Sequence, residues 1–360
     1  MRTAVVILNW KTRAYRARNL PPLLESLQGQ DAAVVVADNA STDGSRELLA
    51  ERFPDVQTLL LDDNYGFTGG YNRAFAQLLE GEGGSPEYLV LLNSDVEVPQ
   101  GWLQPLVDWM DAHPDYAACG PKLLALEQDA TAPGCYRRCD RFEYAGAAGG
   151  CLDRYGYPFC RGRVLSRTEP DRGQYDRPAD VLWVSGACLL VRASCWRSIG
   201  PLDARFFAHM EEIDWCWRAA LAGWRVGVVP QSRVWHLGGG TLAPASPLKL
   251  KLNYRNGLLL LENNLPATLG ERAARRRICV RKILDCAAAI VYLLSGKPAY
   301  ARAVRDAHRE YRTLRSLAPS PAQTATGAAP AGFYKLRILL QALLRGPGIF
   351  DYLRRYEDSH

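Results

Sequence analysis

The chain has 360 residues, of which 48% are hydrophobic and 23% are charged. A chain of this length and composition can bury a large core, which excludes a disordered protein and predicts one main domain with a smaller appended segment. The formal net charge of +6 suits anionic partners such as phosphates or acidic lipid headgroups, although so small an excess does not by itself identify a partner.

We find no pattern of a targeting signal or a membrane span. The first apolar run, residues 4–8, is too short for a signal peptide and is followed by Asn9. Residues 283–295 are fewer than the roughly 18 to 20 apolar residues that a bilayer requires, and they include Asp285. Ten cysteines without a secretion signal are typical of reduced thiols, so we expect a cytoplasmic protein.

The N-terminal third alternates between strand-like and helix-like segments. Strands are predicted at residues 3–8, 32–37, 56–61 and 88–92, and helices at 20–27, 46–53 and 71–79. This alternation predicts an α/β fold with a mostly parallel sheet between helices. Polar residues follow each strand, at 9–11, 38–43, 62–70 and 93–95. Because parallel strands end at one edge of the sheet, we expect these four loops to meet at one ligand-binding crevice.

The remaining sequence is less regular. Residues 119–162 are rich in Gly and aromatic residues, which favours loops or an insertion, and 181–191 are strand-like again. We divide the chain into a main domain of residues 1–245, a basic helical extension of 246–315, a Pro/Ala/Ser-rich linker of 316–332 and a C-terminal amphipathic helix in 333–360.

Two polar segments follow predicted strands. In Asn93-Ser94-Asp95, a carboxylate at the open end of a strand is placed to hold a divalent cation, but such an Asp is more often a turn or helix cap. Residues 62–72 form a Gly-rich segment before a helix, whose amides could approach a phosphate or ribose. A plain structural turn explains this segment equally well, and neither the P-loop nor the dinucleotide pattern is present.

An acidic cluster and one histidine complete the candidate site. Glu211, Glu212 and Asp214 lie within four positions, where mutual repulsion can raise a pKa toward that of a general base. A solvated acidic helix start is the alternative, but the aromatic residues on both sides make full solvation less favourable. His236 precedes a run of glycines and is either a metal ligand or an ordinary surface histidine.

Taken in order, these segments resemble the inverting glycosyltransferases of family two, in particular the rhamnosyltransferase- and galactofuranosyltransferase-like branch. The matching segments are Asp38–Ser45, Asn64–Phe67, Gly69–Asn72, Asn93–Asp95, Ser185–Cys188, Glu211–Asp214 and His236. The resemblance runs from about residue 3 to residue 264. It implies a GT-A fold, with a Rossmann-like mixed sheet flanked by helices and residues 1–245 as the catalytic domain, followed by a C-terminal helical extension.

The resemblance also implies roles for individual residues. Asp38 corresponds to the carboxylate that reads the nucleotide base. The donor-binding residues that it implies are Asn9, Asp38, Asn64, Gly66, Phe67, Gly69, Gly70, Asn72, Asn93, Ser94, Gly186 and Ala187. Asp95 resembles the metal-binding end of the Asp-x-Asp motif, and His236 resembles the histidine that completes coordination of Mg²⁺ or Mn²⁺.

The catalytic motif departs from the family pattern. Glu212 aligns with the usual catalytic aspartate, Glu211 stands beside it, and Asp214 is expected to contact the acceptor. The usual Glu-Asp-x-Asp reads Glu-Glu-x-Asp here, so a longer side chain has to reach the acceptor oxygen. Asn93 replaces the first carboxylate of the metal motif, which leaves Asp95 as the stronger ligand.

The implied activity is transfer of rhamnose or another hexose from a dTDP- or UDP-linked donor to a saccharide or polyprenyl-linked acceptor in cell-surface polysaccharide synthesis. No nucleic acid partner is implied, and the oligomeric state stays open. A nucleotidyltransferase would carry a basic Gly-rich signature near its N-terminus, and none is present. A non-catalytic nucleotide-sugar-binding protein would not need the acidic cluster of residues 211–214.

Two further features allow two interpretations each. A basic run precedes the apolar residues 283–294 and comprises Arg272, Arg275, Arg276, Arg277, Arg281 and Lys282. This pairing fits either attachment to the inner face of the plasma membrane or a helix face packed on the main domain. Four cysteines gather in the irregular region, namely Cys135, Cys139, Cys151 and Cys160. They fit either a structural zinc site or loop and core thiols, and their spacing favours the latter.

Overall fold

The computed structural model describes residues 1–81, 84–129, 134–238, 246–317 and 329–359. In this part of the chain, ten strands form a central mixed sheet. They are β1 (Thr3–Asn9), β2 (Ala32–Asn39), β3 (Gln57–Leu61), β4 (Tyr88–Leu92), β5 (Val96–Glu97), β6 (Tyr116–Gln128), β7 (Tyr136–Phe142), β12 (Ala179–Asp180), β13 (Cys188–Arg192) and β14 (Arg225–His236). Their order along the main path is β12-β14-β6-β13-β4-β1-β2-β3.

The N-terminal half of this sheet is parallel, as the sequence predicts. β1 pairs in parallel with β2 and β4, and β2 pairs in parallel with β3. Side chains alternate between the two faces of β1: Ala4 and Val6 join one apolar core, and Val5 and Ile7 join the other. β13 runs antiparallel to β4 and β6, which makes the sheet mixed and confirms the predicted α/β class.

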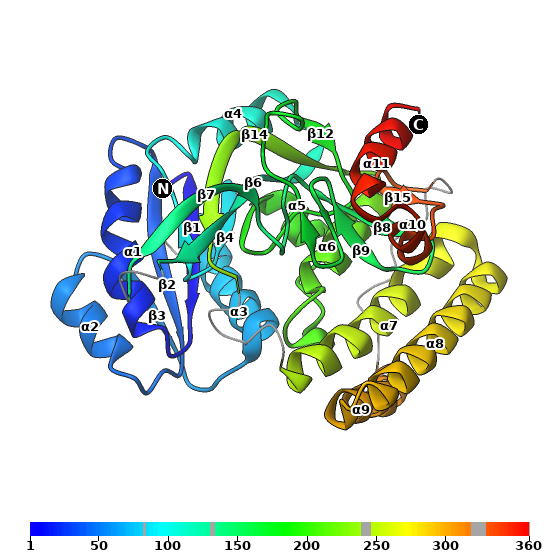
Figure 1. Cartoon of the computed structure of the whole chain (residues 1–360). Coiled ribbons are helices and arrows are strands. Elements are labelled where there is room, and N and C mark those ends of the chain that lie inside the picture. The colour runs from blue at the N-terminus through cyan, green and yellow to red at the C-terminus, as the bar shows by residue number, and fades with distance from the viewer. Residues whose placement is uncertain (82–83, 130–133, 239–245, 318–328, 360) are drawn as a thin grey trace.

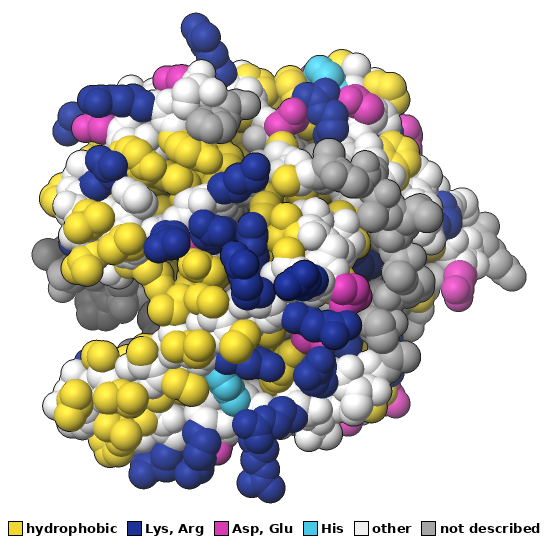
Figure 2. Space-filling model, turned by 90° about the vertical axis from the view of Figure 1, so that its right-hand side faces the viewer, with side chains coloured by type: hydrophobic (Ala, Val, Ile, Leu, Met, Phe, Trp, Pro, Cys, Tyr) yellow, Lys and Arg dark blue, Asp and Glu magenta, His cyan; other side chains and the backbone are white. Residues whose placement is uncertain are grey.

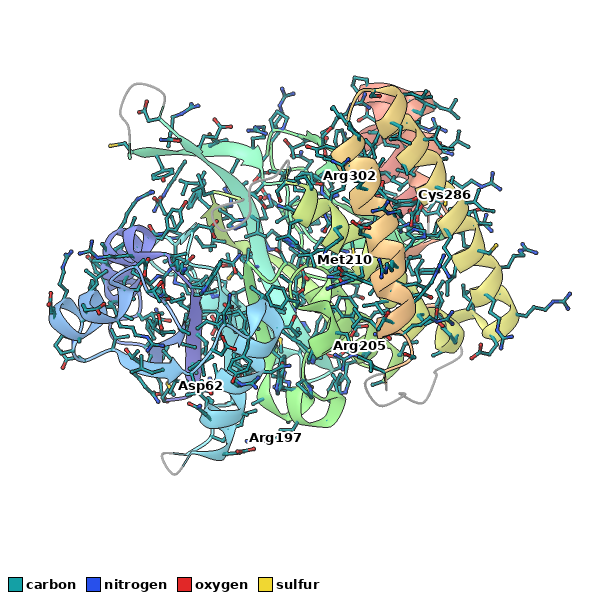
Figure 3. The ribbon with its side chains drawn as sticks, turned by 90° about the horizontal axis from the view of Figure 1, so that it is seen from below. Asp62, Arg197, Arg205, Met210, Cys286 and Arg302 are labelled. Carbon is teal, nitrogen blue, oxygen red and sulfur yellow. The ribbon has the colours of Figure 1, made fainter. Side chains whose placement is uncertain are left out.

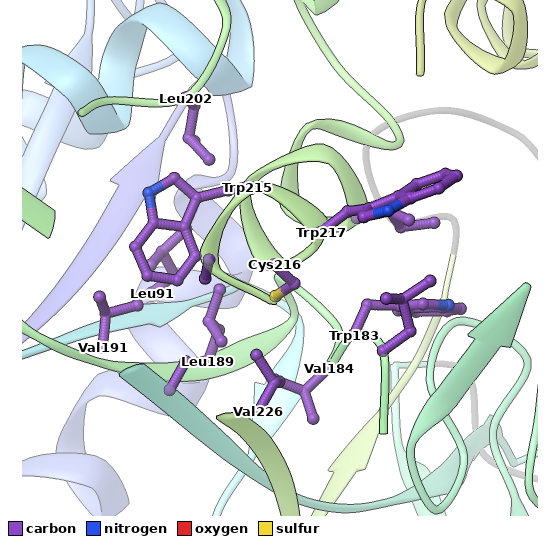
Figure 4. Packing of buried hydrophobic residues seen from close by; sticks show 14 of the residues in the cluster. Leu91, Trp183, Val184, Leu189, Val191, Leu202, Trp215, Cys216, Trp217 and Val226 are labelled. Carbon is purple, nitrogen blue, oxygen red and sulfur yellow. The ribbon is translucent and has the colours of Figure 1, made fainter. Parts of the chain in front are cut away.

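Six helices flank this sheet on both faces (Figure 1). They are α1 (Arg13–Ser26), α2 (Ser45–Arg52), α3 (Gly66–Glu80), α4 (Gln104–Ala112), α5 (Ala193–Ile199) and α6 (Glu211–Leu221). Trp215 and Cys216 of α6 point to the same core as Leu189 of β13, as Figure 4 shows. Burial of such aromatic and aliphatic side chains fixes α6, and therefore its first turn, against the sheet.

Residues 119–162, which we expected to be loops or an insertion, are mostly strands. β6 and β7 belong to the main sheet, and a second sheet has the order β11-β10-β9-β8-β15 in the described residues. Its strands are β8 (Gly150–Asp153), β9 (Pro158–Cys160), β10 (Arg163–Val164), β11 (Arg167–Thr168) and β15 (Phe333–Tyr334). The prediction was wrong because β6 pairs with β14, about a hundred residues away, and a local pattern does not contain such a partner.

Three long helices follow the main domain, as the sequence predicts: α7 (Pro247–Leu269), α8 (Glu271–Leu294) and α9 (Pro298–Leu314). They pack against one another as a helical lobe at the lower right of Figure 1. None of the described helices is long and apolar enough to cross a bilayer.

The C-terminal segment is not the single helix that we expected. Residues 333–360 contain β15, then α10 (Ile338–Arg345), a 3₁₀ turn (Gly346–Gly348) and α11 (Ile349–Asp358). Gly346-Pro347-Gly348 ends the first helix because Pro lacks the backbone N–H and Gly is a weak helix former. Ile338 and Ile349 pack against Cys151 of the second sheet. Residues 318–328 of the expected linker lie outside the described residues.

Candidate functional site

The first part of the site is formed by the adjacent ends of β1 and β2. Asn9 pairs in register with Asp38, and its Nδ2 donates to Asp38 Oδ2 over 2.7 Å. Ser41 N and Arg46 Nε donate to Asp38 Oδ1. Burial disfavours the charge, but the hydrogen bonds from Ser41, Arg46 and Asn9 outweigh it and hold the pKa of Asp38 below its usual value. Asp38 is 0% exposed, so in this conformation its carboxylate holds two strand ends together.

The Gly-rich segment is the beginning of a helix and not a loop around an open site. Helix α3 starts at Gly66, five residues before the predicted start. Gly66 has φ +67°, and a Cβ there would overlap Phe207, whereas a Cβ at Gly70 would overlap Leu8 of β1. Gly66 and Gly70 therefore allow close packing of α3, and their approach to a phosphate stays a prediction.

Other residues of this segment also have internal partners. Asn72 exchanges two hydrogen bonds with the backbone of Leu202, so it anchors α3 and does not face a ligand. Asn64 Oδ1 accepts from Asn39 Nδ2 and from the Gly66 amide. Gly69 lies in the first turns of α3, where an added Cβ would overlap Tyr65.

The turn of Asn93, Ser94 and Asp95 joins the same sheet edge to β13. Asn93 N donates to Ala187 O over 2.9 Å, and Asn19 Nδ2 donates to Ser94 O over 2.9 Å. The bond from Asn93 places Ala187 beside the end of β4. Phe67 and Glu212 both lie beside Gly186, at the position that a Cβ would occupy.

His236 stands between two buried carboxylates. Its Nε2 lies 3.2 Å from Asp95 Oδ1, and its Nδ1 lies 3.4 Å from Glu143 Oε2. All three residues are at most 6% exposed. Burial disfavours the charged imidazole, but Asp95 and Glu143 outweigh it and raise the pKa of His236 to about 10. The structure thus brings together the two predicted metal ligands and adds Glu143, which no sequence motif indicates.

Two cations beside this group were also missed. Lys249, in the first turn of α7, faces Glu143 and Asp95, and burial lowers its pKa despite these carboxylates. Arg16 of α1 is 1% exposed, and its Nε and Nη1 have no hydrogen-bond partner. Burial lowers the pKa of Arg16 to about 10, although Tyr71 and Asp95 favour its charge. Neither residue belongs to a recognisable pattern in the sequence.

The two glutamates at the start of α6 differ in access. Glu211 is 3% exposed, whereas Glu212 is partly exposed next to Gly186. Burial and the neighbouring charges of Glu212 and Asp214 raise the pKa of Glu211 well above its usual value. Burial also raises the pKa of Glu212, while nearby backbone amides, including that of Gly186, oppose the rise. Glu212 Oε2 is buried without a hydrogen-bond partner.

Asp214 does not face the site, contrary to the prediction that it contacts an acceptor. It is 0% exposed, and its Oδ2 accepts from Arg218 Nε over 2.8 Å. Its Oδ1 accepts from Asn263 Nδ2 and Asn264 Nδ2, both over 2.9 Å. All of these donors are internal, so Asp214 joins α6 to α7.

The loop before α6 is held in an unfavourable backbone conformation. Phe207, His209 and Met210 all have positive φ, at 62°, 71° and 70°. Side chains with a Cβ rarely adopt this region, and each such residue costs about 1–3 kcal/mol. Figure 3 shows Arg205 and Met210 on this loop, close to α7. The surrounding structure has to supply the free energy that keeps the loop in place.

Helix α7 supplies that free energy through two side chains. Asn256 is 0% exposed, and its Nδ2 lies 3.0, 2.8 and 2.7 Å from the carbonyl oxygens of Phe206, Ala208 and His209. Arg255 Nη2 donates to Phe206 O over 2.7 Å. We call these two residues the α7 clamp, because they fix the backbone from which Glu211 and Glu212 project.

A cavity of about 580 Å³ lies beside the start of α1, between α1 and α2. It is lined by Lys11, Thr12, Arg13, Ala14, Tyr15, Ala17, Asp43, Leu48, Arg52 and Tyr136. Three of these side chains are cationic, so the cavity suits an anionic group. It shares the β1–α1 turn with the edge that holds Asn9.

The four candidate zinc ligands do not form a site. Cys151 and Cys160 are buried in the second sheet, Cys139 is partly exposed, and Cys135 is exposed. Among the residues that the structure describes, no group of three or more His, Cys, Asp or Glu side chains is arranged to hold a metal ion. The zinc interpretation is therefore contradicted, and the buried pair are core thiols.

Solved structures identify the class of fold. The crystal structure of GalNAc-T7 with UDP, GalNAc and Mn²⁺ matches 73% of this chain and 48% of its own, with a TM-score of 0.51 at 18% identity. The mannosyltransferase PcManGT from Pyrobaculum calidifontis, in complex with GDP-Man and Mn²⁺, matches 88% of this chain and 83% of its own, with a TM-score of 0.50 at 16% identity. The mixed sheet with its polar edge is thus the GT-A fold of glycosyltransferases.

Sequence comparison narrows this class to a family. Residues 11–144 match the family model described as Glycosyl transferase family 2. An N-acetylglucosaminyl-diphospho-decaprenol L-rhamnosyltransferase of Mycobacterium tuberculosis is 33% identical over 212 residues, which cover 57% of this chain and 66% of the relative, just under two thirds of its length. Residues 11–144 are thus similar to family 2 glycosyltransferases, and over a longer stretch the chain is similar to rhamnosyltransferases.

We expect Asn256→Ala to destabilise the protein by about 1–3 kcal/mol, because the carbonyl groups of Ala208 and His209 lose the Asn256 amide as a donor while the strained loop remains. Urea unfolding followed by tryptophan fluorescence measures this change. Gln104→Ala, an exposed amide on α4, is the control and should stay within about 0.5 kcal/mol of wild type. Equal stability of both variants would contradict the assignment of the clamp.

Proposed function

We propose that the protein is an inverting glycosyltransferase that moves a hexose, such as rhamnose, from a dTDP- or UDP-linked donor to a hydroxyl of a saccharide or lipid-linked saccharide in cell-surface polysaccharide synthesis. The family match and the rhamnosyltransferase relative support the class of reaction. The observation that carries the proposal is the position of Glu212, partly exposed beside Gly186 and Phe67, with one carboxylate oxygen lacking a partner.

Glu212 is better suited than Glu211 to act as the general base. A base has to reach the acceptor hydroxyl and to be ionised when it takes the proton. Glu211 is buried and its pKa is raised well above the usual value, so it favours the protonated form. Glu212 is the more accessible of the two, and the Gly186 amide favours its charged form. Deprotonation of the acceptor by Glu212 supports attack on the anomeric carbon from the face opposite the leaving diphosphate.

The residues at Asp95 and His236 fit a divalent cation. Ligand atoms about 2.1 Å from one ion and at right angles to each other are about 3 Å apart. The 3.2 Å between His236 Nε2 and Asp95 Oδ1 matches this separation. We propose that these two residues hold Mg²⁺ or Mn²⁺, and the two solved neighbours contain Mn²⁺. Such an ion, when bound, neutralises charge on a departing diphosphate.

The cations of this region suit the same diphosphate. The ammonium group of Lys249 interacts electrostatically with Glu143 and Asp95, and the guanidinium group of Arg16 interacts with Asp95. Both are partly or fully desolvated, which strengthens their attraction for an anion. The donor-binding role of Asn9, Asn93, Ser94 and Ala187 remains part of this proposal, on the ground that they lie along the same sheet edge.

Glu212→Gln should lower sugar transfer by about 100- to 10,000-fold, because an amide does not accept the proton of the hydroxyl. Donor binding, measured by calorimetry with a nucleotide sugar, should stay close to wild type. A panel of dTDP- and UDP-sugars with a polyprenyl-diphosphate-linked GlcNAc acceptor gives the transfer rate. Glu211→Gln is the matched control and should retain most of the activity. Wild-type turnover in Glu212→Gln would refute the assignment.

The raised pKa of Glu212 predicts an acid limb in the rate profile. The carboxylate has to be ionised, so the single-turnover rate should fall as the pH drops through a value above that of an ordinary glutamate, near 4.5. The limb should be absent from the residual activity of Glu212→Gln. A wild-type rate that stays constant down to the ordinary glutamate range would count against Glu212 as the base.

Glu143→Gln should weaken Mn²⁺ binding about 10- to 100-fold. A carboxylate that contacts the second nitrogen of a ligating histidine orients the imidazole ring and raises the basicity of that ring. Electron paramagnetic resonance of free Mn²⁺ measures the affinity without any turnover. Glu127→Gln, a carboxylate on nearby β6, should bind Mn²⁺ as wild type does. Unchanged affinity in Glu143→Gln would remove the positioning role.

A further inference from the structure

Helix α8 packs one face against the main domain and exposes the opposite face to solvent. On the inner face, Arg281 is 3% exposed, pairs with Asp285 over 2.8 Å and donates to the carbonyl oxygen of Gly156. Arg277 also turns inward and donates to Arg154 O. The basic run noted in the sequence is therefore divided, because two of its arginines stabilise the packing of α8 on the main domain.

The other face of α8 exposes large apolar side chains. Ile283, Ile290, Leu293 and Leu294 are 62%, 57%, 56% and 84% exposed. They repeat at intervals of three, four and seven residues, so they form one stripe. We call this stripe the outer face of α8. Figure 2 shows hydrophobic side chains gathered toward one end of the lower helical lobe, with Lys and Arg side chains beside them.

Exposed arginines continue the same stripe toward the start of the helix. Arg272, Arg275 and Arg276 are exposed, and Arg275 lies 3.4 Å from Glu271. Residues 271–294 are all described, and their two acidic members are Glu271, at the helix start, and Asp285, which is buried. The outer face therefore combines an apolar half with a cationic half and carries almost no negative charge.

The apolar half lies at the end of the lobe that is nearest to the candidate site. Tyr292 of α8 contacts Tyr254 of α7. From Tyr254, α7 continues for about 7.5 Å back to Lys249, which faces Asp95. Figure 3 shows α8, with Cys286, on the outer side of the lobe, and α9, with Arg302, beside it.

We propose that the outer face of α8 docks the protein on an anionic lipid bilayer. This proposal rests on the proposed function in one respect, namely that docking would bring the protein to a lipid-linked acceptor. Leu and Ile side chains enter the boundary between headgroups and acyl chains, and the arginines pair with lipid phosphates. A second copy of this chain is a poorer occupant. A parallel pairing of two α8 helices sets arginine against arginine, and an antiparallel pairing sets the apolar half against the partner's arginines.

Vesicle flotation of the full chain tests this proposal. We expect wild type to float with vesicles of phosphatidylcholine and phosphatidylglycerol at about three to one, and more weakly with phosphatidylcholine alone. Ile290→Asp with Leu294→Asp should weaken binding about ten-fold or more. Arg272→Ala and Arg276→Ala should each weaken it about five-fold, only on anionic vesicles. Leu60→Asp is the matched control, because Leu60 is 61% exposed on β3, and it should bind as wild type does.

Three results would overturn the proposal. The first is that wild type does not float, and the second is that the double Asp variant floats as well as wild type. The third is that wild type is a dimer that does not float, whereas the double Asp variant is a monomer. The proposed function is tested separately, with a short-chain, water-soluble acceptor. Transfer to that acceptor should be the same in wild type and the double Asp variant. Transfer without flotation refutes the docking alone, and flotation without transfer refutes the glycosyltransferase activity alone.

Discussion

The contact between α7 and the segment before α6 is the constraint on which the candidate site depends. Three residues with positive φ precede Glu211 and Glu212 of the candidate site, and a loop of this kind does not hold its shape unaided. The α7 clamp donates to its carbonyl oxygens, and Asn263 and Asn264 hold Asp214 one turn further along. The helical lobe therefore supports the candidate site physically, although it follows the main domain in the sequence.

The same region concentrates charges that repel one another. Asp95 and Glu143 share one histidine, and Glu211 lies beside Glu212 in a buried environment. Carboxylates in such surroundings are costly unless cations or protons compensate them. Lys249 and Arg16 offset part of the cost, and a raised pKa offsets another part. An arrangement this unfavourable on its own is typical of a site that binds charged ligands.

The sequence predicted the order of strands and helices in the N-terminal third, and with it the sheet edge along which Asn9, Asp38 and Asp95 lie. It did so because hydrophobic periodicity and strand-end loops are local signals. The roles of Asp214 and Asn72 were mistaken because their partners, in α7 and before η1 (Ala204–Phe206), are distant in the chain. Glu143 was missed for the same reason, since only the folded sheet brings the end of β7 to the end of β14.

The second sheet has a consequence for how the protein is made. Its edge strand β15 pairs with β8 in parallel register, Phe333 beside Leu152, although about 180 residues separate them. A ribosome synthesises β15 after the helical lobe, so β8 and its neighbours have an open edge while that lobe is being made. Completion of this sheet therefore has to follow synthesis of the helical lobe, and a chaperone that shields the open edge of β8 would act during that interval.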